Sequence, residues 1–109
     1  MVSATESGMM TTYLATPERG EGPGVLVLHA WWGLTGFFKS FCDRLAKEGF
    51  FALAPDLYHG ATAATIAQAK RLRSKLDRGQ ASKEITTAAD TLCTHPAVRG
   101  DRFASVGFS

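Results

Sequence analysis

The sequence of 109 residues lacks a long hydrophobic run and a strong charge of either sign. Its apolar stretches, such as residues 25–28, are far too short for a bilayer, which takes about 20 residues of helix. The first ten residues include Glu6 and show no basic start before an apolar segment, so they do not resemble a signal peptide. The net charge of +2 is too small to indicate binding to nucleic acid or to an anionic membrane. We therefore expect a cytoplasmic protein with neither of these partners.

Cysteine is also scarce. The two cysteines, Cys42 and Cys93, are spaced neither as a CxxC pair nor as a zinc site. Each lies on the apolar side of a predicted helix, which predicts two buried thiols in a reducing compartment. Neither a metal nor a cofactor is expected, and the sequence contains no internal repeat.

The sequence does contain short, continuously apolar stretches, which are typical of strands buried on both faces. The predicted strands cover residues 25–28, 50–54 and 103–106. The second is stopped by Pro55-Asp56, and the third is entered through Gly100-Asp101. A weaker alternation predicts an N-terminal hairpin from residues 2–5 and 9–16, with residues 6–8 in its turn.

Apolar residues at helical spacing separate these strands. One helix is closed by Gly49 and a later one ends before Pro96, while a less regular helix covers residues 63–76. The apolar face of the first helix consists of Phe38, Phe41, Cys42 and Leu45, and that of the last consists of Ile85, Ala88, Ala89, Leu92 and Cys93. Because parallel strands need long crossovers, this order predicts an α/β fold, with a mainly parallel sheet and helices on both faces.

The last four residues, 106–109 (VGFS), follow the final predicted strand. A small residue two places before a serine begins the G-x-S-x-G nucleophile elbow, in which a strained strand-to-helix turn exposes the serine. This motif would make Ser109 a nucleophile. The alternative is a strand that runs into an ordinary polar turn.

A second motif, residues 29–33 (HAWWG), comes directly after the first buried strand. A loop at this place can turn a backbone N–H toward the nucleophile, and acyl transfer needs two such donors to stabilise the oxyanion. One would come from this loop and one from the residue after the serine. The alternative is that Trp31 and Trp32 are large core residues and that Gly33 forms a turn.

Together these stretches resemble the dienelactone hydrolase family. The resemblance rests on residues 24–34 (GVLVLHAWWGL), 37–46 (FFKSFCDRLA), 49–60 (GFFALAPDLYHG) and 103–109 (FASVGFS), about nine tenths of the chain in the family's order. It implies an α/β-hydrolase fold that cleaves small esters and lactones with a triad of nucleophile, Asp and His and without a metal. Ser109 matches the nucleophile, and Trp31 matches the residue whose backbone N–H lines the oxyanion hole.

Two departures from the family's founding type occur together. That type has a cysteine nucleophile where this chain has Ser109, and a glutamate where it has Ala30. The glutamate interacts with the resting thiol, and a hydroxyl, which is far less acidic, does not need that partner. The resemblance therefore implies a serine esterase branch, with a substrate that need not be dienelactone itself.

The triad partners of Ser109 are not expected within residues 1–109. In this fold the acid and the histidine follow the nucleophile, whereas His29, His59, His95 and Asp56 all precede it. We interpret His29 as a structural hydrogen-bonding residue and Asp56 as a turn residue. Residues 1–109 are thus expected to form the N-terminal part of a single α/β-hydrolase domain, truncated after the nucleophile strand and inactive as a fragment.

The substrate is expected to be a small carboxylic ester or lactone, neutral or anionic, that passes through an acyl-serine intermediate. Candidates for substrate contact are Trp32, Arg71, Arg73 and Arg78, although a basic cluster of this kind is also typical of a solvated helix face. One alternative function is a non-catalytic α/β module that binds a ligand at its strand ends. Another is a thioesterase or peptidase of the same fold.

Overall fold

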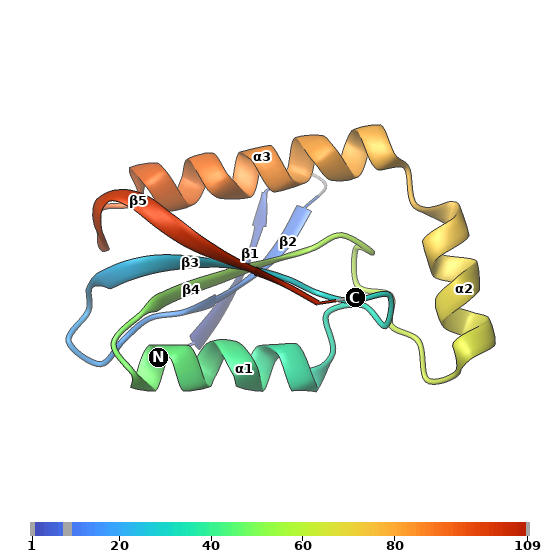
Figure 1. Ribbon diagram of the computed structural model, residues 1–109, viewed down its shortest axis with the longest axis horizontal. Helices are drawn as coiled ribbons and strands as arrows, with labels where there is room; N and C mark the ends of the chain where they lie inside the picture. Colours follow the sequence, from blue (N-terminus) through green and yellow to red (C-terminus); the bar gives the residue numbers. More distant parts are fainter. Residues whose placement is uncertain (1, 8–9, 109) are drawn as a thin grey trace.

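The apolar strands lie in one five-stranded sheet in a computed structural model that describes residues 2–7 and 10–108 (Figure 1). The strands are β1 (Val2–Ser7), β2 (Met10–Ala15), β3 (Gly22–Leu28), β4 (Phe51–Asp56) and β5 (Val98–Gly107), in the spatial order β1-β2-β4-β3-β5. β3 pairs in parallel with β4 and β5, while β2 pairs antiparallel with β1 and β4. The three predicted core strands are therefore parallel, and the N-terminal hairpin makes the sheet mixed.

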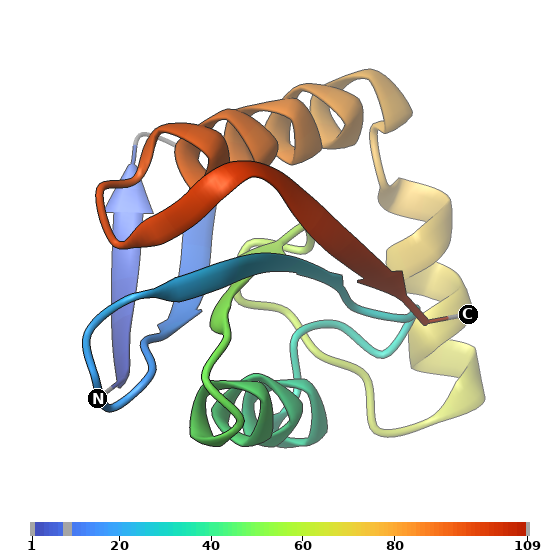
Figure 2. The same cartoon turned by 60° about the vertical axis from the view of Figure 1, so that its left-hand side comes forward.

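Helices cover both faces of the sheet, as predicted (Figure 2). They are α1 (Gly36–Lys47), α2 (Ile66–Lys75) and α3 (Arg78–Thr94). α1 packs on one face and α3 on the other, whereas α2 stands at the end of the sheet and links the two layers (Figure 1). Within residues 2–7 and 10–108, no helix is both long and apolar enough to cross a bilayer.

The two faces of β3 explain its continuously apolar sequence. Val25 and Val27 contact the core under α1, which includes Phe38 and Cys42. Leu26 points the other way, into the core under α3 with Leu92. Successive side chains of a strand alternate between its faces, so a strand covered on both sides must be apolar at every position.

Capping residues set the helix ends more tightly than periodicity predicts. α2 begins at Ile66 rather than at residue 63, because the Thr65 side chain accepts a hydrogen bond from the Gln68 N–H and caps the helix. α3 ends at Thr94, ahead of Pro96 as predicted. Gly49 follows α1 with φ of 96°, a left-handed conformation that glycine adopts without strain.

Several strand ends are shifted by one to three residues, such as the start of β3 at Gly22 rather than at residue 25, and three further boundaries differ from the prediction. β1 continues through Ser7, which pairs with Met10, and the predicted turn residue Gly8 and strand residue Met9 lie outside the described residues. Pro55 and Asp56 do not stop β4 but belong to it. Proline is tolerated there because the pairing with β3 ends at Leu53, so no N–H is required on that side.

The third difference lies in β5, which begins at Val98 rather than at residue 103. Arg99 pairs with Pro23, but the next pair is Phe103 with Gly24, so residues 100–102 bulge out of the strand. Gly100, with φ of 85°, allows the backbone to make this excursion. The predicted entry through Gly100-Asp101 is in fact the middle of a longer strand.

The two cysteines differ in environment. Cys42 is completely buried under the sheet, as predicted, whereas Cys93 is exposed. The prediction for Cys93 was wrong because the neighbouring Leu92 occupies the position of α3 that faces the core.

We expect the fold to lose stability at alkaline pH through Cys42. Burial first, and the Asp43 carboxylate second, raise the pKa of its thiol from 9.0 to about 12. The contribution of the buried Cys42 thiol to stability is complete below pH 9.0, which is its pKa in the unfolded chain. It is lost as the pH rises toward about 12, the pKa in the folded protein. Urea titrations should show the free energy of unfolding falling across this interval.

Two variants check the assignment. Cys42→Ala should be less stable at neutral pH but should lose stability less steeply with rising pH, whereas Cys93→Ala should keep the original slope. Tyr13, whose pKa is raised to about 12 by burial and by the hydrogen bond its hydroxyl donates to Asp43, accounts for part of the remaining slope. An unchanged slope in Cys42→Ala would contradict the assignment.

Candidate active site

A cavity of about 440 Å³ lies where the carboxyl ends of β3 and β4 meet the end of β5. Ligands of open α/β sheets bind at this edge, because the loops that leave parallel strands converge there. The lining comes from the β3 loop, the β4 turn, α2 and the residue after β5: His29, Ala30, Trp31, Leu57, Tyr58, Arg73, Leu76 and Phe108.

In the loop after β3, the peptide group between Ala30 and Trp31 is held in place by hydrogen bonds to its carbonyl. The Ala30 carbonyl oxygen accepts a hydrogen bond from His29 Nδ1 at 2.7 Å and another from the Gly33 N–H at 3.1 Å. This carbonyl shares its peptide with the Trp31 N–H, which in a trans peptide points the opposite way. Among the described residues, the Trp31 N–H donates no hydrogen bond. The loop thus presents a fixed backbone donor without a protein partner there.

Glycine is required at the end of this loop. Gly33 has φ of 91°, and a Cβ atom there would lie 2.5 Å from the Ala61 carbonyl oxygen. Both the conformation and the close approach exclude a side chain. The predicted turn role of Gly33 is confirmed, and it is compatible with a donor role for the same loop.

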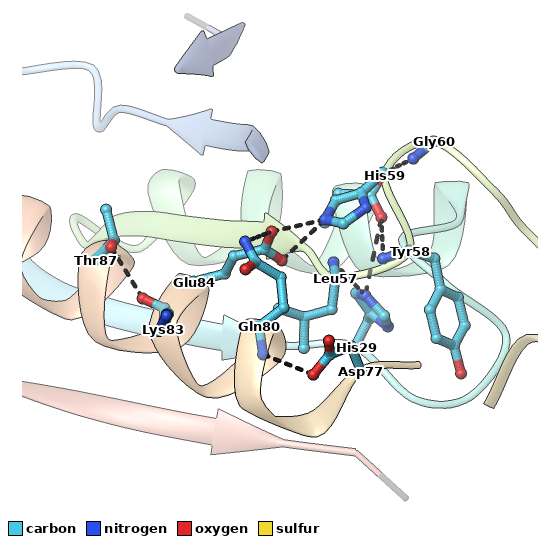
Figure 3. Close-up of polar contacts among 11 residues, drawn as sticks. His29, Leu57, Tyr58, His59, Gly60, Asp77, Gln80, Lys83, Glu84 and Thr87 are labelled. Carbon is cyan, nitrogen blue, oxygen red and sulfur yellow. Dashed lines mark hydrogen bonds and ion pairs between the residues drawn. The ribbon is translucent and has the colours of Figure 1, made fainter. Parts of the chain in front are cut away.

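His29 bridges this loop and the turn after β4. Its Nε2 accepts a hydrogen bond from the Leu57 N–H at 3.0 Å (Figure 3). Because a backbone N–H can only donate, Nε2 carries no proton and the proton lies on Nδ1, which donates to Ala30. Both nitrogens are therefore engaged in structural hydrogen bonds, as predicted.

The turn after β4 is built around Asp56. Its carboxylate accepts hydrogen bonds from the Tyr58 N–H at 3.1 Å and the Gly60 N–H at 2.8 Å, which confirms the predicted turn role. The turn passes through His59, whose φ of 53° is left-handed and uncommon outside glycine and asparagine. This geometry sends the backbone of Leu57 and Tyr58 along the wall of the cavity.

A buried carboxylate fastens the same turn to α3 (Figure 3). His59 Nε2 donates to the two Glu84 carboxylate oxygens at 2.7 and 3.0 Å, and Gln80 Nε2 donates to one of them at 3.1 Å. The Glu84 side chain is 5% exposed and that of His59 is 41% exposed. A carboxylate this buried is stable only with such partners, so the pair ties the turn to the helix.

The predicted nucleophile, Ser109, lies outside the described residues. The residue before it, Phe108, continues the β5 ladder by donating its N–H to the Leu28 carbonyl at 3.2 Å. The Phe108 ring packs against Phe37, Phe38 and Phe41 of α1, with centroids 5.0 to 6.0 Å apart in edge-to-face geometry. Phe108 is thereby fixed at the cavity edge.

The structure brings together two of the residues predicted from sequence. The Arg73 guanidinium lies over the Trp31 ring, 5.5 Å from its centroid, and both side chains line the cavity. Trp32, Arg71 and Arg78 do not line it. Trp32 packs against the core under α1, and its carbonyl accepts a hydrogen bond from the Ala63 N–H.

Sequence reasoning gave no role to Leu57, Tyr58, Leu76 or Phe108, all of which line the cavity. Burial raises the pKa of the Tyr58 hydroxyl, while the nearby Arg73 charge acts in the opposite direction. The position of Tyr58, two residues past the end of β4, was the available signal, since residues past a parallel strand's carboxyl end line such sites.

Parallel strands between two helical layers, with a cavity at their carboxyl ends, are common to open α/β folds. The likeness to solved dienelactone hydrolases makes the chain part of an α/β-hydrolase fold. Over residues 10–109 the sequence matches the dienelactone hydrolase family. The chain belongs to this family.

Similarity to individual proteins supports this family assignment. The chain is 50% identical over 64 residues to Protein usf of Aquifex pyrophilus, a match that covers 55% of this chain and 27% of that protein. It is 39% identical over 61 residues to the carboxymethylenebutenolidase of a Pseudomonas species, covering 54% and 26%. It is also similar to the structure of a dienelactone hydrolase-like promiscuous phosphotriesterase from metagenomic libraries, with a TM-score of 0.72 and 27% identity, covering 99% of this chain and 48% of that one. The chain thus spans about half the length of that structure.

We expect His59→Asn to destabilise the fold more than Glu84→Gln. Asparagine tolerates the left-handed backbone at this position but cannot reach α3, so Glu84 would keep only Gln80 as a partner. An incompletely satisfied buried acceptor costs about 1–3 kcal/mol. Glu84→Gln retains an acceptor oxygen for His59 and should cost about 1 kcal/mol or less.

Urea denaturation would measure the change in the free energy of unfolding for both variants. Asp90→Asn, an exposed acid on the same helix, serves as the control and should change the free energy of unfolding by less than about 0.5 kcal/mol. Equal stability of His59→Asn and the unmodified protein would show that the pair does not fasten the turn.

Proposed function

We propose that the protein is a serine hydrolase that cleaves small carboxylic esters or lactones through an acyl-serine intermediate. One observation carries this proposal: Phe108, which precedes Ser109, lines the same cavity as Trp31, whose N–H has no partner among the described residues. A nucleophile and an oxyanion donor on one cavity would be two of the elements that acyl transfer requires. Membership in the dienelactone hydrolase family supports the same chemistry.

In the proposed reaction Ser109 Oγ attacks the substrate carbonyl carbon, and the Trp31 N–H stabilises the oxyanion that forms. Collapse of this intermediate breaks the bond to the leaving oxygen and leaves an acyl-serine, which water then hydrolyses. A base must take the serine proton, because a free hydroxyl is a poor nucleophile. The second oxyanion donor is the N–H of the residue that follows the nucleophile in this fold.

The histidines of this chain are poorly placed to be that base. Both nitrogens of His29 are engaged, His59 is held by Glu84, and His95 accepts the Ala97 N–H after α3. In α/β-hydrolases the acid and the histidine follow the nucleophile along the chain. We therefore assign both roles to the part of the protein that follows Ser109.

The cavity favours a small substrate with an apolar body and an anionic group. Its walls are mainly aromatic and aliphatic, and Arg73 supplies a positive charge at one side. A guanidinium that stacks on an aromatic ring can still donate its N–H groups to a carboxylate. The relative from Pseudomonas is named a carboxymethylenebutenolidase, which supports a lactone that carries a carboxylate as the substrate.

The protein expressed from its complete gene should hydrolyse p-nitrophenyl acetate, and Ser109→Ala should lower kcat by roughly 10⁴-fold, because the variant loses its nucleophile. Release of p-nitrophenolate measures the rate. Residues 1–109 alone should show no turnover. Full activity of Ser109→Ala would overturn the serine mechanism, and binding of esters without turnover in the complete protein would favour the ligand-binding module.

Arg73→Gln should discriminate between charged and neutral substrates. The complete protein's kcat/KM for the mono-p-nitrophenyl ester of succinate should fall about 10- to 100-fold, the value of a charge-assisted hydrogen bond, while that for p-nitrophenyl butyrate changes little. Arg71→Gln is the matched control, since Arg71 lies on the same helix, is exposed and does not line the cavity. Equal losses for both esters in Arg73→Gln would argue against recognition of an anion.

A further inference from the structure

His29 is buried beside the cavity and contacts two backbone groups from different loops. Its Nδ1 donates to the carbonyl of the Ala30–Trp31 peptide. Its Nε2 accepts from the Leu57 N–H (Figure 3). A side chain that could serve as a base is therefore used to hold backbone. The peptide that it holds is the one that carries the proposed oxyanion donor.

We infer that His29 is a positioning residue that sets the direction of the Trp31 N–H. The carbonyl and the N–H of a trans peptide lie in one plane and point in opposite directions, so fixing the carbonyl fixes the donor. Without the His29 contact, the Ala30 carbonyl keeps only the Gly33 N–H at 3.1 Å, within its own four-residue turn. One local bond leaves the peptide plane free to tilt, whereas two bonds from different directions restrain it.

The ring of His29 is itself restrained from the opposite side. The Leu57 N–H belongs to the turn that Asp56 organises and that His59 fastens to Glu84 on α3. Tyr58 packs against the His29 ring with a centroid distance of 5.1 Å. The position of the His29 ring is thereby set by contacts that extend from the cavity edge to α3.

This inference rests on the proposed function, because it concerns the oxyanion donor of that reaction. It differs from a general stabilising role in one respect. The two nitrogens of His29 do separate work: the bond from Nδ1 orients the donor, and the bond to Nε2 only places the ring. Loss of the first should affect the transition state, in which the oxyanion exists, more than it affects substrate binding.

Two substitutions separate the two bonds. The amide nitrogen of asparagine can occupy the place of Nδ1, so His29→Asn retains the donor to Ala30 and loses the acceptor for Leu57. The amide oxygen of glutamine can occupy the place of Nε2, so His29→Gln retains the acceptor and loses the donor. In the complete protein with p-nitrophenyl acetate, we expect His29→Gln to lower kcat about 10- to 100-fold with KM nearly unchanged. His29→Asn should keep a kcat within about threefold of the unmodified protein and should speed hydrogen exchange at the Leu57 amide, measured by NMR.

His95→Gln is the matched control, because His95 also accepts a backbone N–H but lies after α3, away from the cavity. It should leave kcat unchanged. Wild-type kcat in His29→Gln, or equal losses of kcat in His29→Gln and His29→Asn, would overturn the inference while leaving the ester-hydrolase proposal intact. Absence of turnover in the unmodified complete protein would instead overturn the proposed function, and with it the assigned role of His29.

Discussion

The parallel pairing of β3 with β5 is the constraint on which the candidate site depends. β3 carries the loop with Trp31 at its carboxyl end, and β5 leads to Phe108 at its own. The two ends meet only because Gly24–Leu28 and Phe103–Gly107 pair in unbroken register, which extends to the bond from Phe108 to the Leu28 carbonyl. A shift of one residue would invert every side chain of β5 and move Phe108 away from the α1 phenylalanines.

The bulge in β5 does not disturb the register between β3 and β5 near the cavity. Before the bulge, Val98 and Arg99 pair with the start of β3, and three extra residues then leave the ladder before Phe103. α3 approaches this region closely, since a Cβ atom on Gly24 would lie 3.0 Å from the Leu92 side chain. The strand thus accommodates the helix at its beginning and recovers its register where the cavity is formed.

The sequence predicted those parts of the fold that depend on local patterns. Alternation and helical spacing located three buried strands, two amphipathic helices and the hairpin, because burial on a sheet or under a helix constrains every second or every third to fourth residue. The turn role of Asp56 and the structural role of His29 also followed from local position. Cys93 was misplaced because a boundary residue of an apolar face can lie on either side of it.

The contacts that fasten the cavity wall could not be predicted in the same way. Glu84 lies on the predicted helix as one acidic residue among polar neighbours, and its bond to His59 spans 25 positions in the chain. Only the path of the turn after β4, with a left-handed residue at its centre, brings them together. The choice of Arg73 over Arg71 and Arg78 likewise depends on where α2 stands at the end of the sheet, which no periodicity encodes.

The environment of Ala30 bears on whether the proposed nucleophile is a serine or a thiol. Its side chain is buried in the core under α1 with Leu34 and Phe38, and its carbonyl is occupied by His29 and Gly33. A carboxylate at this position would lose its hydration among apolar side chains, at a large cost unless another charge compensated it. A thiol nucleophile can donate a hydrogen bond, or its proton, to such a carboxylate, whereas the far less acidic serine hydroxyl keeps its proton until a stronger base acts on it. The apolar environment of Ala30 is therefore compatible with the proposed serine nucleophile, and it leaves the backbone of the same loop to serve as the proposed oxyanion donor.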